Sequence, residues 1–375
     1  MKDLRKKFIK KAKRIVVKVG SAVVASGGAG AGDIFSRLAA EIEEIRRTGR
    51  DVVIVSSGAI AIGIEKLGLK SRPTSIPERQ AVAAVGQGTL MSRYEAAFSE
   101  RGVRVAQVLL THDDLGSRKR FLNARNTLLT LLGFGIVPIV NENDTVAVEE
   151  IKFGDNDELS ALTTNLTEAD LLVILSDIDG LFDKDPKKEP GARKIPLVED
   201  VDGLRLEAFA PSAGKLGTGG IRSKIEAARK AAHFGAATVI ANGNIPGILT
   251  GILGGDDHGT LFLPREDRLT SKKHWIAFST RPSGRLFVDE GAKEAVITRG
   301  KSLLPSGIRD VDGTFDAGEV VHCVDMKGME FARGVSNYSS SEIARIKGLK
   351  TKEVEAALGY KVYDEVIHRD NLVVL

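Results

Sequence analysis

Two polar clusters near the middle of the chain hold the side chains best suited to chemistry. Residues 141–144 read Asn-Glu-Asn-Asp and, ten residues on, residues 154–160 read Gly-Asp-Asn-Asp-Glu-Leu-Ser. Carboxylates and carboxamides at this density beside apolar runs are costly to fold unless they hold a ligand. The first cluster directly follows the apolar run 135–140, and ligands of open α/β sheets bind just past such strand ends. A solvated acidic turn that only caps a helix at Asp155 is the alternative.

Two lysines stand where a phosphate group could be bound. Lys18 lies inside the apolar run 15–19, one position before its end, where a lysine is costly unless it reaches a ligand or a carboxylate. Lys224 stands at the head of a helical pattern, after the segment 214–220 (Gly-Lys-Leu-Gly-Thr-Gly-Gly). Glycines, a threonine and a helix-borne lysine can together cradle a phosphate chain. The alternatives are a snorkelling Lys18 and a flexible loop followed by a solvated lysine.

Small residues at two strand-to-helix turns suit the binding of an anion. Gly20 and Ser21 end the first apolar run, and residues 56–59 (Ser-Ser-Gly-Ala) end the run 51–56 and open a helix. At such turns backbone N–H groups can approach an anion, and the helix dipole favours negative charge. Two turns of this kind in successive units are stronger support than one, since many turns contain glycine for steric reasons alone.

Several familiar catalytic sites are excluded by the motifs that the sequence lacks. There is no P-loop motif, no convincing dinucleotide-binding G-x-G-x-x-G and no nucleophile motif G-x-S-x-G. The six histidines form no ligand-spaced set with Cys323, the one cysteine, so we predict no zinc-type metal site. We interpret Cys323 as a buried structural residue of a strand.

The remaining inventory suits phosphoryl transfer from a nucleotide, a reaction that depends mostly on positioning and charge neutralisation. A lysine ~4 Å from a phosphate oxygen contributes on the order of 4 kcal/mol at an effective dielectric near 20. The absence of a marked histidine base favours a carboxylate as the acceptor, because a carboxyl group with a pKa of about 4 is already ionised at pH 7.

Apolar runs of strand length alternate with helical patterns through the first two thirds of the chain. The runs are continuous, which indicates burial on both faces and a mainly parallel sheet. Predicted strands are residues 15–19, 51–56, 103–109, 136–140, 171–175 and 237–241, and predicted helices are residues 33–48, 77–100, 119–132, 158–166 and 222–234. We therefore predict an α/β fold in which helices sandwich a mainly parallel sheet.

The pattern changes after residues 254–260 to short strands, at residues 285–288, 318–324, 330–333 and 371–375. We predict a catalytic domain over residues 1–264, a linker over 265–280 and a smaller β-rich domain over 281–375. A length of 375 residues accommodates this division.

Bulk composition narrows the classes of function. The net charge of +4 is too small to indicate nucleic-acid binding over the whole surface. One cysteine allows no intrachain disulfide and fits the reducing cytoplasm, and no apolar run reaches transmembrane length. The basic start, residues 1–14, lacks the apolar stretch of a signal peptide, and we interpret it as a solvated helical lead-in.

Several short motifs follow one another along the chain, at residues 17–21, 55–60, 84–87, 121–125, 141–144, 154–157, 176–177 and 217–220, together with Lys224. In this order they resemble the motifs of the glutamate 5-kinases, which have the amino acid kinase fold. The tail, through residues 300–307 and 332–338, resembles the PUA domain that often follows this kinase. The combination is far more specific than any single motif.

The resemblance implies ATP-dependent phosphorylation of the γ-carboxylate of L-glutamate to L-glutamyl 5-phosphate, the first step of proline synthesis. It also implies Mg²⁺ bound mainly through the ATP phosphates, feedback inhibition by proline and a homo-oligomer, either a dimer or a tetramer. Another amino acid kinase, acting on acetylglutamate, aspartate or carbamate, is the alternative within the fold. RNA binding by the PUA-like tail is the alternative of another class, and interleaved acidic residues predict that it is not tight.

The same resemblance assigns roles to particular residues. Lys18 and Lys224 are expected to neutralise the phosphates and the transferred group, and Asp157 to hold both lysines. Ser57, Asp144 and Asn156 match the glutamate-binding positions. The nucleotide-binding positions are matched by Lys18, Ser176, Asp177, Thr218, Gly219, Gly220, Ile221, Arg222, Ser223 and Lys224. No protein ligand of a metal is assigned, and the contacts of the loop 25–32 are left open.

Overall fold

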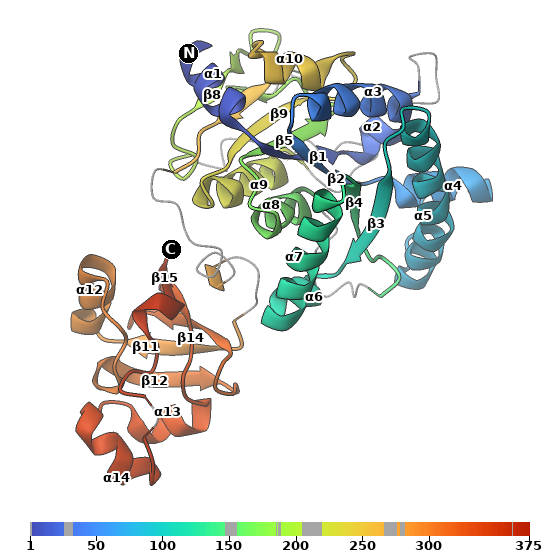
Figure 1. Cartoon of the computed structure of the whole chain (residues 1–375). Coiled ribbons are helices and arrows are strands. Elements are labelled where there is room, and N and C mark those ends of the chain that lie inside the picture. Colours follow the sequence, from blue (N-terminus) through green and yellow to red (C-terminus); the bar gives the residue numbers. More distant parts are fainter. Residues whose placement is uncertain are drawn as a thin grey trace. The chain divides into compact units, whose positions relative to one another are not determined.

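The computed structural model describes residues 2–25, 33–146, 156–184, 186, 189–204, 220–265, 276–277, 282–361 and 363–375. The chain forms two compact units (Figure 1). The N-terminal unit comprises Met1–Leu115 and Lys119–Arg268, and the C-terminal unit comprises Gly116–Arg118 and Leu269–Leu375. Thr218 and Gly219, which were predicted to bind the nucleotide, and residues 26–32 of the loop whose contacts were left open lie outside the described residues.

An eight-stranded sheet forms the centre of the N-terminal unit, in the order β3-β4-β2-β1-β5-β9-β10-β8. All neighbouring strands are parallel except β9 and β10, which are antiparallel. The six strands predicted from apolar runs are confirmed within two residues at each end. The strands are β1 (Arg14–Val19), β2 (Asp51–Ser56), β3 (Val105–Leu110), β4 (Val137–Glu142), β5 (Leu171–Ser176), β8 (Leu197–Val198), β9 (Ala237–Asn242) and β10 (Thr260–Phe262).

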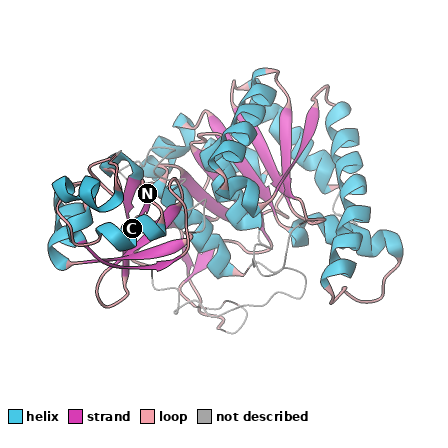
Figure 2. Cartoon of the chain, turned by 90° about the horizontal axis from the view of Figure 1, so that it is seen from below, coloured by secondary structure: helices cyan, strands magenta, loops and turns pink. Residues whose placement is uncertain are grey.

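Helices cover both faces of this sheet (Figure 2), as the continuous apolar strands predicted. Alternate residues of β1 show the arrangement, because Ile15, Val17 and Val19 pack in one core with α3 and α5. Lys18 therefore faces the opposite side, where α8 and α9 lie. The helices are α1 (Lys2–Lys11), α2 (Ser21–Ala25), α3 (Ile34–Arg47), α4 (Ala59–Leu67), α5 (Ile76–Ser99), α6 (His112–Gly116), α7 (Arg118–Gly133), α8 (Asn156–Leu166), α9 (Ile221–His233) and α10 (Ile248–Gly254), and a small hairpin joins β6 (Leu181–Phe182) to β7 (Lys194–Ile195).

Capping side chains mark the start of two of the predicted helices, α3 and α5. Asp33 accepts hydrogen bonds from the backbone N–H groups of Phe35 and Ser36 at the start of α3. Ser75 and Glu78 form a reciprocal capping box at the start of α5. The five helices predicted in this unit are observed within two residues at each end.

Helices α4 and α5 approach each other closely enough to require glycine. A Cβ atom on Gly86 would lie 1.8 Å from the carbonyl oxygen of Ala59, and one on Gly63 would lie 2.0 Å from that of Val82. A Cβ atom on Gly88 would have nothing within 4 Å. Gly86 therefore fixes the position of α5 against the first turn of α4, next to the strand end that the sequence singled out.

The basic N-terminal helix α1 is not the solvated lead-in that the sequence predicted. Ile9 is fully buried, and Arg5 is only 5% exposed. The Arg5 guanidinium forms an ion pair with Asp257 and donates to the carbonyl oxygens of His258 and Gly259. The apolar side of this short helix and one buried arginine therefore attach it to the unit. The many basic residues of α1 gave no sign of this attachment in the sequence.

The C-terminal unit is built on a five-stranded sheet in the order β12-β11-β13-β14-β15. Four of its strands were predicted, and Cys323 is buried in one of them, as expected. The charged edge strand β12 and the helices were missed. The strands are β11 (Gly284–Val288), β12 (Ile308–Gly313), β13 (Val320–Val324), β14 (Glu330–Val335) and β15 (Leu372–Val374), and the helices are α12 (Glu290–Arg299), α13 (Ser340–Ile346) and α14 (Val354–Leu358), with 3₁₀ turns η4 (Pro305–Gly307), η5 (Thr351–Glu353) and η6 (Arg369–Asn371).

Within the described part of the chain, no helix combines the length and the apolar character needed to cross a membrane.

Candidate active site

A buried carboxylate lies between two lysine side chains on one face of the N-terminal sheet. Asp157 Oδ1 is 2.6 Å from Lys18 Nζ, and Asp157 Oδ2 is 3.0 Å from Lys224 Nζ. Ser223 Oγ also donates to Asp157 Oδ2, at 2.7 Å. Three elements supply these side chains: the end of β1, the first turn of α8 and the first turn of α9. The three residues that the sequence selected for catalysis are thus in direct contact.

The electrostatics of this cluster favour an anionic ligand. Asp157 is fully buried, and burial alone would raise the pKa of its carboxyl group. Lys18 and Lys224, with the hydroxyl of Ser223, outweigh that effect and hold the pKa well below its usual range. Two ammonium groups and one carboxylate give the trio a net charge of +1. A buried excess of positive charge is costly, so binding an anion such as a phosphate is favourable there.

A chain of amide side chains extends from this cluster toward α5. Asn156, next to Asp157 in α8, donates from Nδ2 to Ser57 Oγ at 2.9 Å and to Asn141 Oδ1 at 3.0 Å. Asn141 in turn donates from Nδ2 to Gln87 Oε1 at 2.8 Å. Adjacent positions of one helix therefore serve two groups: Asp157 contacts the lysines, while Asn156 ties together the ends of β2 and β4.

Two acidic side chains follow the amide chain at the end of β4. Burial, with the nearby Asp144 carboxylate, raises the pKa of Glu142 to about 8. Burial also raises the pKa of Asp144 to about 6, although Arg79 of α5 opposes the shift. Both groups therefore bind protons more strongly in the folded chain than in the unfolded one, so their contribution to stability is lost as the pH rises from about 4 through 8. Groups that destabilise the protein at neutral pH in this way favour a bound cation.

Comparisons with known proteins agree with this geometry. The amino acid kinase family model matches residues 13–242, and the PUA domain model matches residues 284–358. The glutamate 5-kinase of Geobacter sulfurreducens is 52% identical over 373 residues, covering 99% of this chain and 100% of the relative. That of Geobacter metallireducens is 54% identical with the same coverage, and that of Caldanaerobacter subterraneus subsp. tengcongensis is 50% identical over 363 residues, covering 96% and 98%. The chain belongs to the glutamate 5-kinase family.

Among the described residues of this family member, the positions predicted to bind the nucleotide lie at the ends of the adjacent parallel strands β1 and β5 and at the start of α9. Ser176 ends β5 and donates from Oγ to the Asp177 carboxylate at 3.1 Å. Ser176 is paired in register with Asn242 of β9. Helix α9 begins after Gly220, which has no capping side chain. The backbone N–H groups at the start of α9, beside Lys224, therefore receive no hydrogen bond from a side chain of the N-cap residue. Ile221 and Arg222 complete this first turn.

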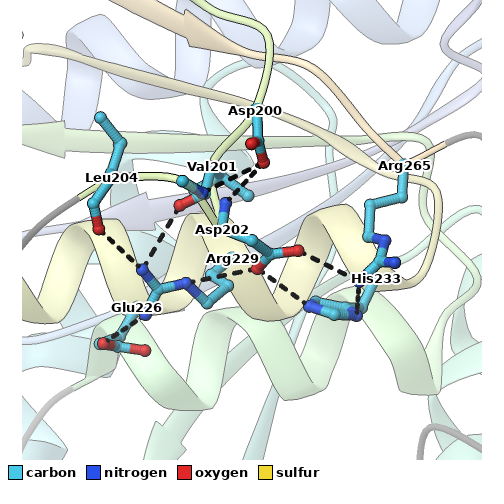
Figure 3. Close-up of polar contacts among 9 residues, drawn as sticks. Asp200, Val201, Asp202, Leu204, Glu226, Arg229, His233 and Arg265 are labelled. Atoms are coloured by element: carbon cyan, nitrogen blue, oxygen red, sulfur yellow. Dashed lines mark hydrogen bonds and ion pairs between the residues drawn. The ribbon is translucent and has the colours of Figure 1, made fainter. Parts of the chain in front are cut away.

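A cluster that the sequence did not reveal fastens the segment before residue 205 to α9 (Figure 3). Arg229 donates to the carbonyl oxygens of Val201 and Leu204 at 3.3 and 3.4 Å. Asp202 accepts from Arg229 and Arg265. Their sequence separations give no local signal, so only the fold could bring these residues together. The cluster fixes α9, and with it the lysine in its first turn.

Sequence reasoning also missed Gln87, Asn141 and Glu142 as individual site residues. Asn141 and Glu142 stood inside a cluster that had been singled out, and Gln87 stood in the motif 84–87. The available signal was the motif itself, since nothing local indicates that a glutamine of α5 reaches an asparagine 54 residues away.

Proposed function

We propose that the chain transfers the γ-phosphoryl group of ATP to the γ-carboxylate of L-glutamate, giving L-glutamyl 5-phosphate. The buried Lys18–Asp157–Lys224 cluster carries this proposal. It offers a net positive charge where a transferring phosphoryl group needs it, and family membership supports glutamate as the acceptor. The product is the activated acid with which proline synthesis begins.

The transfer needs no proton to be removed from the acceptor. A γ-carboxylate oxygen attacks the γ-phosphorus, the bond from that phosphorus to the β,γ-bridging oxygen breaks, and ADP leaves with the electron pair. Lys18 and Lys224 neutralise the charge that spreads over the phosphoryl oxygens and the leaving group. Asp157 keeps the two ammonium groups close together, which their mutual repulsion would otherwise oppose.

The acidic end of the site supports an amino acid acceptor with a free α-ammonium group. Burial raises the pKa of both Glu142 and Asp144, and a bound ammonium group would stabilise the charged form of each carboxylate. N-acetylation removes this positive charge, so the alternative acceptor acetylglutamate loses the interaction. Ser57 and Asn156, 2.9 Å apart, lie between the acidic end and the lysines, where the carbon chain of glutamate would lie.

The nucleotide is assigned to Ser176, Asp177 and residues 218–224, at the ends of β5 and the start of α9. We further propose that Mg²⁺ accompanies ATP and is held mainly by its phosphates. Among the described residues no group of three His, Cys, Asp or Glu side chains is placed to hold a metal ion. A hydrated cation bound through phosphate oxygens would supply further charge neutralisation.

Further assignments extend this proposal to the whole protein. We place the catalytic domain at residues 1–264, the linker at 265–280 and the PUA domain at 281–375, in a cytoplasmic homo-oligomer, either a dimer or a tetramer. Proline shares an ammonium and a carboxylate group with glutamate, which supports feedback inhibition at the acceptor site.

We do not expect the C-terminal unit to bind RNA tightly. Several of its cations are matched with carboxylates: Lys293 with Asp325 at 2.9 Å and Arg309 with Asp289 at 2.8 Å. Such pairs reduce the free positive charge that phosphate binding requires.

Hydroxylamine trapping tests the reaction directly. The purified chain with ATP, Mg²⁺ and glutamate should form γ-glutamyl hydroxamate in proportion to ADP, and acetylglutamate or aspartate should give far less. Efficient hydroxamate formation from one of those acceptors instead of glutamate would replace this proposal with the corresponding kinase.

A further inference from the structure

Two buried polar atoms of the amide chain have no hydrogen-bond partner among the described residues: Gln87 Nε2 and Asn156 Oδ1. Each costs folding free energy unless a ligand or water satisfies it. One is a donor and the other an acceptor, and they belong to the two ends of the same chain, Gln87–Asn141–Asn156. A ligand that both accepts and donates would satisfy both atoms.

The assignment of the free donor to Gln87 follows from its neighbours. Asn141 Oδ1 accepts from Asn156 Nδ2 at 3.0 Å and from the backbone N–H of Glu142 at 2.9 Å. Turning the Asn141 amide over would lose both bonds, so its Nδ2 must face Gln87. Gln87 consequently presents Oε1 to Asn141, at 2.8 Å, and its Nε2 remains as a donor.

Helix packing places Gln87 beside a second set of donors. Its neighbour Gly86 contacts the backbone of Ala59, the first residue of α4. Helix α4 begins after Gly58, which supplies no capping side chain, so the backbone N–H groups of its first turn have no side-chain acceptor from that residue. The end of the amide chain away from the lysines is therefore rich in donors, which suits a carboxylate.

We propose that Gln87 is a substrate-binding residue that donates a hydrogen bond from Nε2 to the α-carboxylate of the acceptor. This inference rests on the proposed function, because it concerns how glutamate is held. The γ-carboxylate belongs at Lys18 and Lys224, and an ammonium group can only donate, so the α-carboxylate is the group of glutamate that Gln87 can hold. Asn156 Oδ1, the free acceptor, then faces the α-ammonium group.

Two substitutions remove the Nε2 donor of Gln87, and together they distinguish a role in binding the substrate from a role in holding Asn141. Gln87→Glu keeps an oxygen for Asn141 but replaces the donor with a second oxygen. Gln87→Met removes both polar atoms at similar size. Glu95→Gln, a carboxyl–amide exchange on the exposed side of the same helix, is the matched control. Thermal melting of each variant checks that it folds.

Each variant is assayed with glutamate and with 4-aminobutyrate, which is glutamate without its α-carboxylate. For both Gln87 variants we expect kcat/KM for glutamate to fall by about 10- to 100-fold, the range for a hydrogen bond to a charged group. The value for 4-aminobutyrate should change less than about threefold by the same reasoning, since the missing group cannot lose a contact. If 4-aminobutyrate is turned over too slowly, its inhibition constant against glutamate takes the place of kcat/KM.

Equal losses for both acceptors would overturn the proposal and leave Gln87 a support of Asn141. Unchanged kcat/KM for glutamate in Gln87→Glu would overturn it as well. A failure of the proposed function would look different, because the unmodified chain would then form no γ-glutamyl hydroxamate.

Discussion

Exchanging Asp157 for asparagine removes the one negative charge that holds two lysines together in the buried cluster. Its carboxylate oxygens lie 2.6 and 3.0 Å from the two ammonium nitrogens, which corresponds to about 6 kcal/mol of attraction per pair at an effective dielectric near 20. Desolvation offsets much of this, and the lowered pKa of Asp157 shows that attraction exceeds the offset. Breaking such a buried pair typically costs about 3–5 kcal/mol, and we expect Asp157→Asn to lose that much stability.

Urea unfolding monitored by circular dichroism measures this loss, with Glu158→Gln as the matched control. Glu158 is the next residue of α8 and pairs with Lys230, but both side chains are partly exposed. Its loss should cost only about 0–1 kcal/mol. The stability that Asp157 contributes is present above its unfolded pKa, about 4, and is lost as the pH falls below it, so the variant should also lose stability less steeply in acid. Equal stabilities for Asp157→Asn and Glu158→Gln would refute the electrostatic account of the cluster.

Other parts of the site and its supporting helix give three more expectations. Lys224→Ala should lower kcat by about 100-fold or more with little change in KM for glutamate, and a raised KM with normal kcat would place this lysine at the acceptor instead. For the unmodified chain, kcat/KM for glutamate should rise as the pH increases through about 6, where Asp144 ionises, and Asp144→Asn should abolish that rise; an identical pH profile would contradict the ammonium contact. Gly86→Ala should lower the melting temperature, because its Cβ atom would lie 1.8 Å from the Ala59 carbonyl oxygen, whereas Gly88→Ala meets no atom within 4 Å and should leave it unchanged or raise it.

The layered sheet could be predicted from the sequence because its strands are buried on both faces and therefore continuously apolar. Lys18 was conspicuous for the same reason, since a charge inside such a run needs a partner. That Asp157 is this partner could not be derived from local pattern: the two residues are 139 positions apart in the sequence. The resemblance to a known family supplied what hydrophobic periodicity could not.

The features that the sequence did not reveal depend on tertiary contacts. Burial of Arg5 is compensated by carbonyl oxygens some 250 residues away, so its helix was predicted to be solvated. Strand β12 (Ile308–Gly313) has mostly exposed, charged side chains, which resemble a loop in composition. The Nε2 atom of Gln87 is identified as a donor without a partner among the described residues because Asn141 donates to the Oε1 atom of the same amide group. Only the folded structure shows this contact.

The central claim is that an oxygen of the glutamate γ-carboxylate attacks the γ-phosphorus of ATP beside Lys18 and Lys224. Glutamate labelled with ¹⁸O in its γ-carboxylate tests it, with ³¹P NMR of the phosphate released when the acyl phosphate cyclises or is hydrolysed at carbon. The account predicts one ¹⁸O atom in each released phosphate, and a Lys18→Ala chain that releases far less phosphate. If phosphate without the label formed as fast as ADP, the phosphoryl group would have passed to water, and the account would be contradicted.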